Sequence, residues 1–158
     1  MSVATSLVTT DAFEQSSWRR WCASIPLGAW LVLVLGIHAS LLPWSASIHS
    51  PTLDEAFHLA GGVRHLKDHL QDIDRGNPPL VGMLAAVPVV TVGVETDWHR
   101  APNSFLVGAD FLTANGPRIF WLMTLGRWML IPLSVWGGLV CYWWANELSG
   151  QRAGFLAA

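Results

Sequence analysis

Charge and cysteine are both scarce in this chain, and each shortage excludes a class of protein. Asp, Glu, Lys and Arg make up 13% of the 158 residues, about half of the roughly 25% found in soluble domains. With a formal net charge of -2 and no basic stripe, the chain lacks the footprint of a nucleic-acid-binding protein. Its two cysteines, Cys22 and Cys141, fit no zinc spacing and no disulfide framework. We expect them to be packed or lipid-facing thiols.

Uncharged apolar sequence, by contrast, is abundant. The runs from Ile25 to Trp44 and from Trp128 to Asn146 contain no charged residue, and each is close to the ~20 residues that cross a bilayer as a helix. The chain has ten tryptophans, a residue that favours the membrane–water interface. Five of them flank the two runs: Trp18, Trp21, Trp44, Trp143 and Trp144. We therefore predict an all-α integral membrane protein with transmembrane helices at 21–44 and 119–146.

The charges near the first run predict an orientation. Arg19 and Arg20 precede it, and the positive-inside rule then places the N-terminus in the cytoplasm. Residues 1–20 read as a disordered cytoplasmic lead-in, 45–118 as a long external loop, and 147–158 as a cytoplasmic turn with the start of a third span. A bacterial inner membrane is the expected location. The alternative is a signal peptide cut near Ser45-Ala46-Ser47, but the apolar run is longer than a usual signal core.

The external loop carries its own helix signals. Thr52 followed by Glu55 predicts a capping box and a juxtamembrane helix over 53–70. The sequence Gly76-Asn77-Pro78-Pro79 ends it, because paired prolines cannot continue a helix. The apolar run 80–94 is too short to span comfortably, so it predicts a helix at the interface or packed on the bundle. A short helix is expected over 105–113, and Asn115-Gly116-Pro117 predicts a turn before the second span.

Acidic and histidine side chains cluster at the start of the predicted loop helix. Asp54 and His58 are four residues apart and share a face, which His65 and His69 continue. A carboxylate there suits general-base catalysis, although acids near a helix N-terminus also simply favour the helix dipole. A divalent metal is a candidate cofactor, and a metal-binding module built on Glu55 with the three histidines is a separate hypothesis. Glu55-x-x-His58 has the spacing of a di-iron bundle, but only one such motif is present.

Arg127 is a charge inside an apolar stretch. Such residues are costly in a membrane and suggest function by default. A guanidinium can bond two phosphate oxygens at once. The competing interpretation is that this arginine only extends to the nearby outer interface.

The order of these motifs resembles that of a known family. The matching residues are Asp54-Glu55 with His58, then Asn77-Pro78-Pro79-Leu80 through Pro88, then Gly126-Arg127, and the tail from Trp144 to Gly150 with Ala153-Gly154. Over about residues 25–158 the chain resembles the N-terminal part of the GT-C-fold membrane glycosyltransferases that use polyprenyl-phosphate sugars. These are the relatives of protein O-mannosyltransferases and aminoarabinose transferases.

The resemblance implies roles for individual residues. Asp54 would be the base that activates the acceptor, Glu55 would support it, and Arg127 would hold the phosphate of the lipid carrier. Asn77, Pro78 and Pro79 would join two helices that lie along the membrane beneath the site. The implied partners are a polyprenyl-phosphate-linked sugar, the lipid bilayer and an acceptor that the sequence does not identify.

Two features depart from the family and leave a rival hypothesis. Asn77 stands where many relatives have a titratable His, and the family has many more spans. We therefore expect this length of chain to lack transferase activity by itself. The rival is a non-enzymatic two-span anchor or assembly partner. It predicts that Asp54, Glu55 and Arg127 point apart and share no cavity.

Overall fold

The computed structural model describes residues 26–96, 98 and 106–158. The expected cytoplasmic lead-in, Cys22 and the beginning of the first span lie outside these residues. Every regular element in the described part is helical, which confirms the all-α prediction. In chain order the elements are α2 (Leu27–Ile48), α3 (Leu53–Asp68), α4 (Pro79–Thr91), α5 (Leu106–Asn115), the 3-10 turn η1 (Gly116–Arg118), α6 (Ile119–Met129), α7 (Ile131–Ser149) and α8 (Gln151–Ala157).

Two stretches are long and apolar enough to cross a membrane, Gly28–Ile48 and Leu106–Ser149. Their length and composition alone also fit a signal sequence or the core helix of a soluble protein. The expected second span is not one straight helix, because α6 and α7 are separated at Leu130. Pro132, near the start of α7, has no N–H to continue the ladder across that break.

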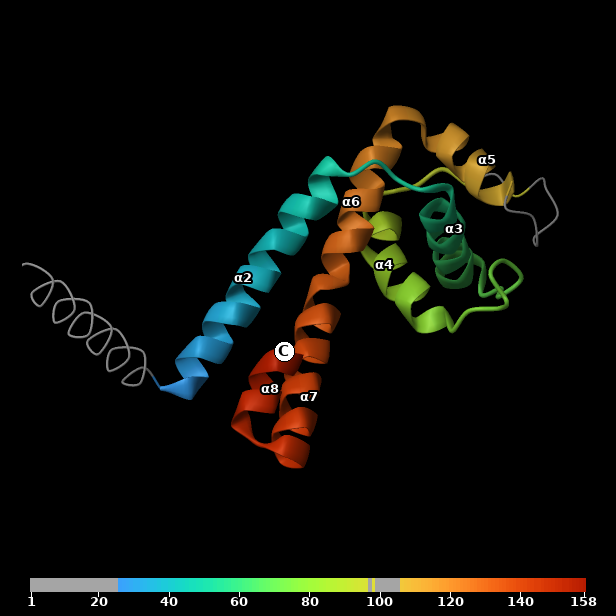
Figure 1. Cartoon of the computed structure of the whole chain (residues 1–158). Helices are drawn as coiled ribbons and strands as arrows, with labels where there is room; N and C mark the ends of the chain where they lie inside the picture. The colour runs from blue at the N-terminus through green and yellow to red at the C-terminus, as the bar shows by residue number, and fades with distance from the viewer. Residues whose placement is uncertain (1–25, 97, 99–105) are drawn as a thin grey trace, which may run out of the picture.

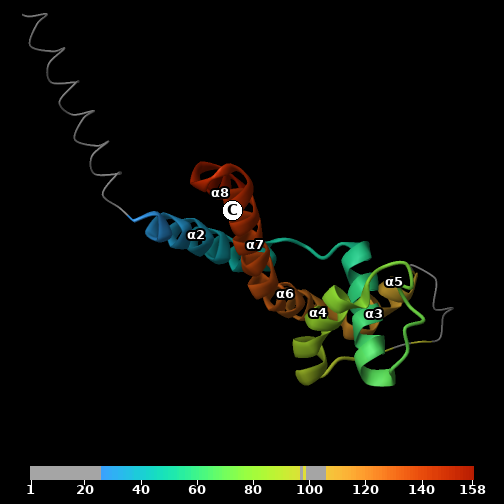
Figure 2. The ribbon, with the colours of Figure 1, turned by 90° about the horizontal axis from the view of Figure 1, so that it is seen from below.

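The helices form two regions that α6 connects. Figure 1 shows α2 and the α6–α7 pair as long arms, with α3, α4 and α5 gathered beside α6 at one end of the molecule. In the view from below (Figure 2), the α3–α5 group lies to one side of α6, while α2, α7 and α8 lie to the other. The predicted external loop is therefore a compact helical unit packed on the start of the second arm.

Helix α3 begins as its sequence predicts. The Thr52 side chain accepts a hydrogen bond from the Glu55 N–H at 3.2 Å, and the Glu55 carboxylate accepts one from the Thr52 N–H at 3.0 Å. This confirms the capping box, which satisfies backbone donors that have no partner within the helix. The helix ends at Asp68, two residues before the predicted end, because His69 adopts a left-handed conformation with φ 57°.

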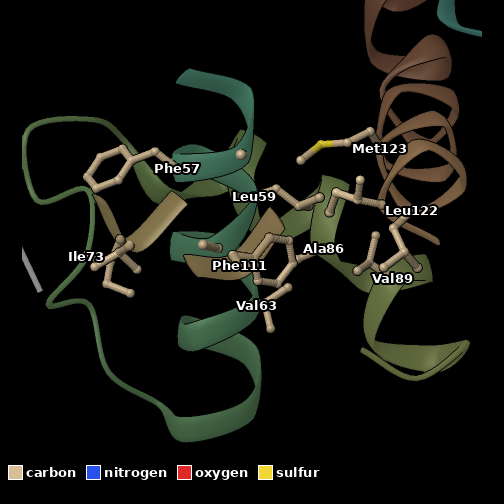
Figure 3. Close-up of a cluster of buried hydrophobic side chains, with 13 residues drawn as sticks. Phe57, Leu59, Val63, Ile73, Ala86, Val89, Phe111, Leu122 and Met123 are labelled. Carbon is tan, nitrogen blue, oxygen red and sulfur yellow. The ribbon is translucent and has the colours of Figure 1, made fainter. Parts of the chain in front are cut away.

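The hydrophobic core lies among α3, α4, α5 and α6. Figure 3 shows side chains from these four elements meeting, among them Val63 of α3, Val89 of α4, Phe111 of α5 and Leu122 of α6. These four are fully buried, and each contributes about 1.5–3 kcal/mol through loss of apolar surface to water. The short apolar run after the prolines is thus α4, packed in this core.

Close helix contact at one point requires glycine. A Cβ atom added to Gly62 of α3 would lie 2.0 Å from the backbone oxygen of Gly82 in α4. No side chain fits at that distance, so these two helices touch backbone to backbone, as small residues permit. The contact fixes α3 against α4 and therefore fixes the distance between the acidic start of α3 and the Pro-Pro turn.

The described chain ends in a helical hairpin. Gly150 has φ 81°, a left-handed value that glycine adopts without strain, and it turns the chain so that α8 packs along α7. The Gly154 position faces the Tyr142 backbone oxygen, 3.0 Å from where a Cβ would lie.

Candidate functional site

Arg127 connects three helices through one guanidinium. Its Nε and Nη2 donate to Glu55 of α3, at 3.0 Å to Oε1 and 2.6 Å to Oε2. Its Nη1 donates to the carbonyls of Ala46 and His49, at 2.9 and 2.8 Å, and Nη2 also donates to the Ser50 carbonyl at 3.2 Å. An arginine side chain has five N–H donors, so all of them are used.

The acceptors explain why an arginine suits this position. Ala46 lies in the last turn of α2, where carbonyls have no partner within the helix and the helix dipole favours a cation. Glu55 lies in the first turn of α3, where the dipole favours an anion. The side chain from α6 therefore joins the end of α2 to the start of α3. We call the Glu55–Arg127 pair, with its bonds to the connector 46–50, the clamp.

The clamp defines the charge of Glu55. The hydrogen bond from Arg127 is the largest influence and lowers the pKa of Glu55. Burial opposes this effect, and the bonds within the Thr52 cap add to it. Because Glu55 is held as a carboxylate with both oxygens engaged, it is a poor proton acceptor. In this arrangement Glu55 positions the start of α3.

His58 lies between two aspartates. Its Nε2 is 3.1 Å from Oδ2 of Asp54, one turn earlier in α3, and its Nδ1 is 2.7 Å from Oδ2 of Asp74 in the segment after α3. Asp54 has a 65% exposed side chain, while that of Asp74 is 15% exposed. We call these three residues the Asp–His–Asp chain. Burial lowers the pKa of His58, but the hydrogen bond and charge of Asp74, with the charge of Asp54, outweigh it, so the pKa is raised.

Asp74 is a site residue that the sequence analysis missed. It lies 16 positions after His58, in a non-helical segment, and has a left-handed backbone with φ 61°. Its Oδ1 accepts a hydrogen bond from Nδ2 of Asn77 at 2.6 Å, and its carbonyl accepts one from the Asn77 N–H at 3.3 Å. Asn77 thus supports the site by holding Asp74. A turn-forming Asp just before Gly76-Asn77-Pro78 is the only signal for it in the sequence.

Two cavities meet at the clamp. The larger, about 400 Å³, lies between α3, α4 and α6, and its polar lining residues are Glu55, His58, Asp74, Asn77 and Arg127. Pro78 also lines it, together with an apolar wall that includes Leu59, Val81, Ala85, Met123 and Leu130. The smaller, about 340 Å³, lies between α2 and the α6–α7 arm and shares Glu55, Arg127 and Leu130. Each cavity is therefore lined by both apolar and charged residues.

The predicted site residues divide into two groups. Glu55, His58, Asn77, Pro78 and Arg127 all line the larger cavity. Asp54 is not among its described lining residues and reaches it through His58. Pro79 lines a neighbouring cavity of about 20 Å³ instead, with His58 and His65.

The proposed metal ligands are not brought together. None of the described His, Cys, Asp and Glu residues forms a group of three or more that suits a metal ion. Both carboxylate oxygens of Glu55 accept hydrogen bonds from Arg127, and each ring nitrogen of His58 lies next to an aspartate oxygen. His69 is an exposed C-cap at the far end of α3. The residues present therefore do not fit the divalent metal that was considered.

A side-chain pair also joins the two long arms. Nε2 of His38 in α2 lies 2.9 Å from the hydroxyl of Ser134 in α7. Polar pairs of this kind hold helices together where water is absent.

Comparisons with protein-family models, curated proteins and solved structures gave no match to this chain.

Proposed function

We propose that this chain is the N-terminal part of a membrane glycosyltransferase that moves a sugar from a polyprenyl phosphate to an acceptor on the outer side of the membrane. One observation carries the proposal. Residues 72 positions apart in sequence, Glu55 and Arg127, meet in one cavity with His58 and Asn77. These four residues belong to the motifs whose order resembles that in the glycosyltransferases. Motifs far apart in the sequence therefore contribute to one site.

The exposed apolar surface supports a membrane location. Large apolar side chains of α2 and α7 are exposed, among them Val32, Ile37, Leu41, Trp136 and Trp144. In water such a surface would be costly, since monomeric soluble proteins rarely expose apolar patches this extensive. We place α2 and the α6–α7 arm across a bacterial inner membrane, with the α3–α5 unit on its outer side and the N-terminus in the cytoplasm.

The larger cavity suits an amphipathic ligand. Its apolar lining residues match an isoprenoid chain, and polar lining residues such as Asn77 match sugar hydroxyls. In the proposed step Asp54 accepts the proton as the acceptor O–H bond breaks. The acceptor oxygen bonds to the anomeric carbon, and the bond from that carbon to the phosphate oxygen breaks, with its electron pair leaving on the phosphate. No metal takes part in this scheme.

The clamp changes the part that Arg127 takes in this scheme. Because its five donors are engaged, a phosphate must replace an existing acceptor. The bond to the Ser50 carbonyl is the longest, at 3.2 Å, and Ser50 is exposed, so water can solvate that carbonyl when it is released. Arg127 therefore binds phosphate by exchanging this bond while it keeps Glu55.

The rival anchor hypothesis is favoured by one observation. A fully bonded Arg127 is what a purely structural role requires. However, the anchor hypothesis predicts that Asp54, Glu55 and Arg127 point apart and share no cavity. Glu55 and Arg127 are in contact and line the same cavities, which argues against it, whereas Asp54 is not among the residues that line them.

The deciding experiment measures donor binding by this chain, and transfer by the full-length enzyme to which it would belong, both in lipid nanodiscs. The probe is a radiolabelled polyprenyl-phosphate mannose, with the unphosphorylated polyprenol as competitor. We expect saturable binding that the polyprenol does not displace. Asp54→Asn should keep binding and, in the full-length enzyme, lower transfer at least ~10²-fold, the usual contribution of a general base. Asp68→Asn is the control, because Asp68 is an exposed carboxylate that pairs with Arg64. Failure of the wild-type chain to bind the donor would overturn the proposal, and binding without transfer would leave a donor-binding protein.

A further inference from the structure

We infer that Asp74 is a positioning residue. It holds the His58 ring next to Asp54, the group that accepts the proton in the proposed step, and so keeps this part of the site in place. This inference rests on the proposed function for its effect on transfer. The hold of Asp74 on His58 stands on geometry alone. Asp74 touches no substrate in the scheme and acts through His58.

The contacts of the Asp–His–Asp chain suit a protonated His58 ring. When the ring is protonated, its two N–H groups face carboxylate oxygens at 2.7 Å (Asp74) and 3.1 Å (Asp54). Two protons shared by two carboxylates and one imidazole leave a net charge of -1 on the three groups. A third proton, taken from an acceptor hydroxyl, makes the chain neutral. The arrangement therefore gains a proton without building up positive charge.

The backbone indicates that Asp74 is held in place for this contact. A non-glycine residue with φ 61° is in the left-handed region, which costs about 1 kcal/mol or more and is least unfavourable for Asn and Asp. Its second oxygen is fixed by Asn77, and a Cβ on Gly61 would lie 3.1 Å from the Asp74 Cβ. The loop is thus packed directly on α3, one turn from His58. These contacts orient the Asp74 carboxylate towards the imidazole.

Other titratable groups face His58 from the neighbouring elements. Glu55 of α3 and Arg127 of α6 line the same cavity but are paired with each other. His65 lies seven residues after His58 in α3, and it shares the cavity of about 20 Å³ with His58 and Asp74. Asp54 and Asp74 are the carboxylates within hydrogen-bond distance of His58 among the described residues. A perturbation of Asp74 should therefore act on His58 more strongly than on the clamp.

The first test needs no transferase activity. The titration midpoint of His58 is followed by NMR of histidine-labelled protein in nanodiscs and assigned with His58→Gln. Asp74→Asn should lower the midpoint below that of the wild type, since it removes the main group that favours the charged ring. Asn tolerates the left-handed backbone as well as Asp. Asp72→Asn is the matched control from the same loop, because Asp72 binds Arg64 at 2.8 Å instead. An unchanged midpoint in Asp74→Asn, or an equal fall in both variants, would overturn the inference.

The second test measures the consequence for transfer. In the full-length enzyme, Asp74→Asn should lower kcat about 10²-fold, the typical cost of a misplaced catalytic group, and leave the KM for the donor unchanged. In a His58→Gln background the same change should have no further effect, because residues acting as one unit are non-additive. A full additional loss in that background would mean a general structural role and would refute positioning through His58. A wild-type chain that does not bind the donor would refute the proposed function, while the NMR result would still decide whether Asp74 holds His58.

Discussion

Arg127→Ala should destabilise the protein more than any surface arginine substitution. The change removes five hydrogen bonds, leaves the carbonyls of Ala46, His49 and Ser50 without these donors, and leaves Glu55 with only its bonds from Thr52. Breaking one side of a fully buried ion pair costs about 3–5 kcal/mol. Here the Arg127 side chain is 20% exposed and that of Glu55 is 38% exposed, so water replaces part of what is lost. We expect a loss of about 2 kcal/mol.

The assay is thermal unfolding followed by circular dichroism in detergent micelles. With the scaling of globular domains of this size, about 2–4 °C per kcal/mol, Tm should fall by about 4–8 °C. Arg127→Lys keeps the charge but has three donors and no planar fork, so roughly half of the loss is expected. Hydrogen exchange should increase in the connector 46–50 and in the first turn of α3, where the clamp acts.

Arg118→Ala is the matched control. This arginine is in the turn just before α6 and donates to the Gly93 carbonyl at 3.0 Å, so its loss should change stability by no more than about 0.5 kcal/mol. If Arg127→Ala and Arg118→Ala had the same Tm, within about 1 °C, the clamp would not stabilise the connection between the helices. The structural reason given for Arg127 would then be wrong.

Two further predictions concern helix packing and pH. Gly62→Ala should cost about 3 kcal/mol or more, because its Cβ meets the Gly82 backbone and overpacking forces backbone shifts. Gly36→Ala, which has open space around it, should be neutral or stabilising in the same Tm measurement. Because the pKa of Glu55 is lowered by folding, its contribution is present above pH 4.5 and is lost as pH falls below that value. Glu55→Gln should flatten Tm against pH in the acid range, and an unchanged acid slope would contradict the clamp.

The local features of this fold were predictable from sequence because their causes are local. Thr52 and Glu55 are three residues apart, so the capping box needs no information from the rest of the chain. The paired prolines likewise begin α4 at Pro79, although α3 ends before them, at Asp68. The separation of α6 and α7 was not predicted, although Pro132 is a signal for it. Apolar composition alone favoured one continuous span, and it does not distinguish a straight helix from two joined at Leu130.

The site was only half predictable, because its other half depends on tertiary contacts. Asp54, Glu55, His58 and Arg127 stand out as polar residues in apolar or helix-start positions. Asp74 does not stand out, since an aspartate in a turn is usually explained by the turn itself. Its role appears only when the segment after α3 folds back over the helix and places its carboxylate 2.7 Å from the imidazole.

Arg127 shows most clearly what sequence reasoning leaves open. A charge at that position suggests either phosphate binding or extension to the interface, and neither hypothesis considers backbone carbonyls as its partners. Those carbonyls face Arg127 because α2 ends at Ile48 and leaves them without helical partners. A phosphate that binds Arg127 must therefore compete with the end of α2. Donor binding and the position of the connector 46–50 are then coupled, and the clamp is where the two proposed roles of Arg127 meet.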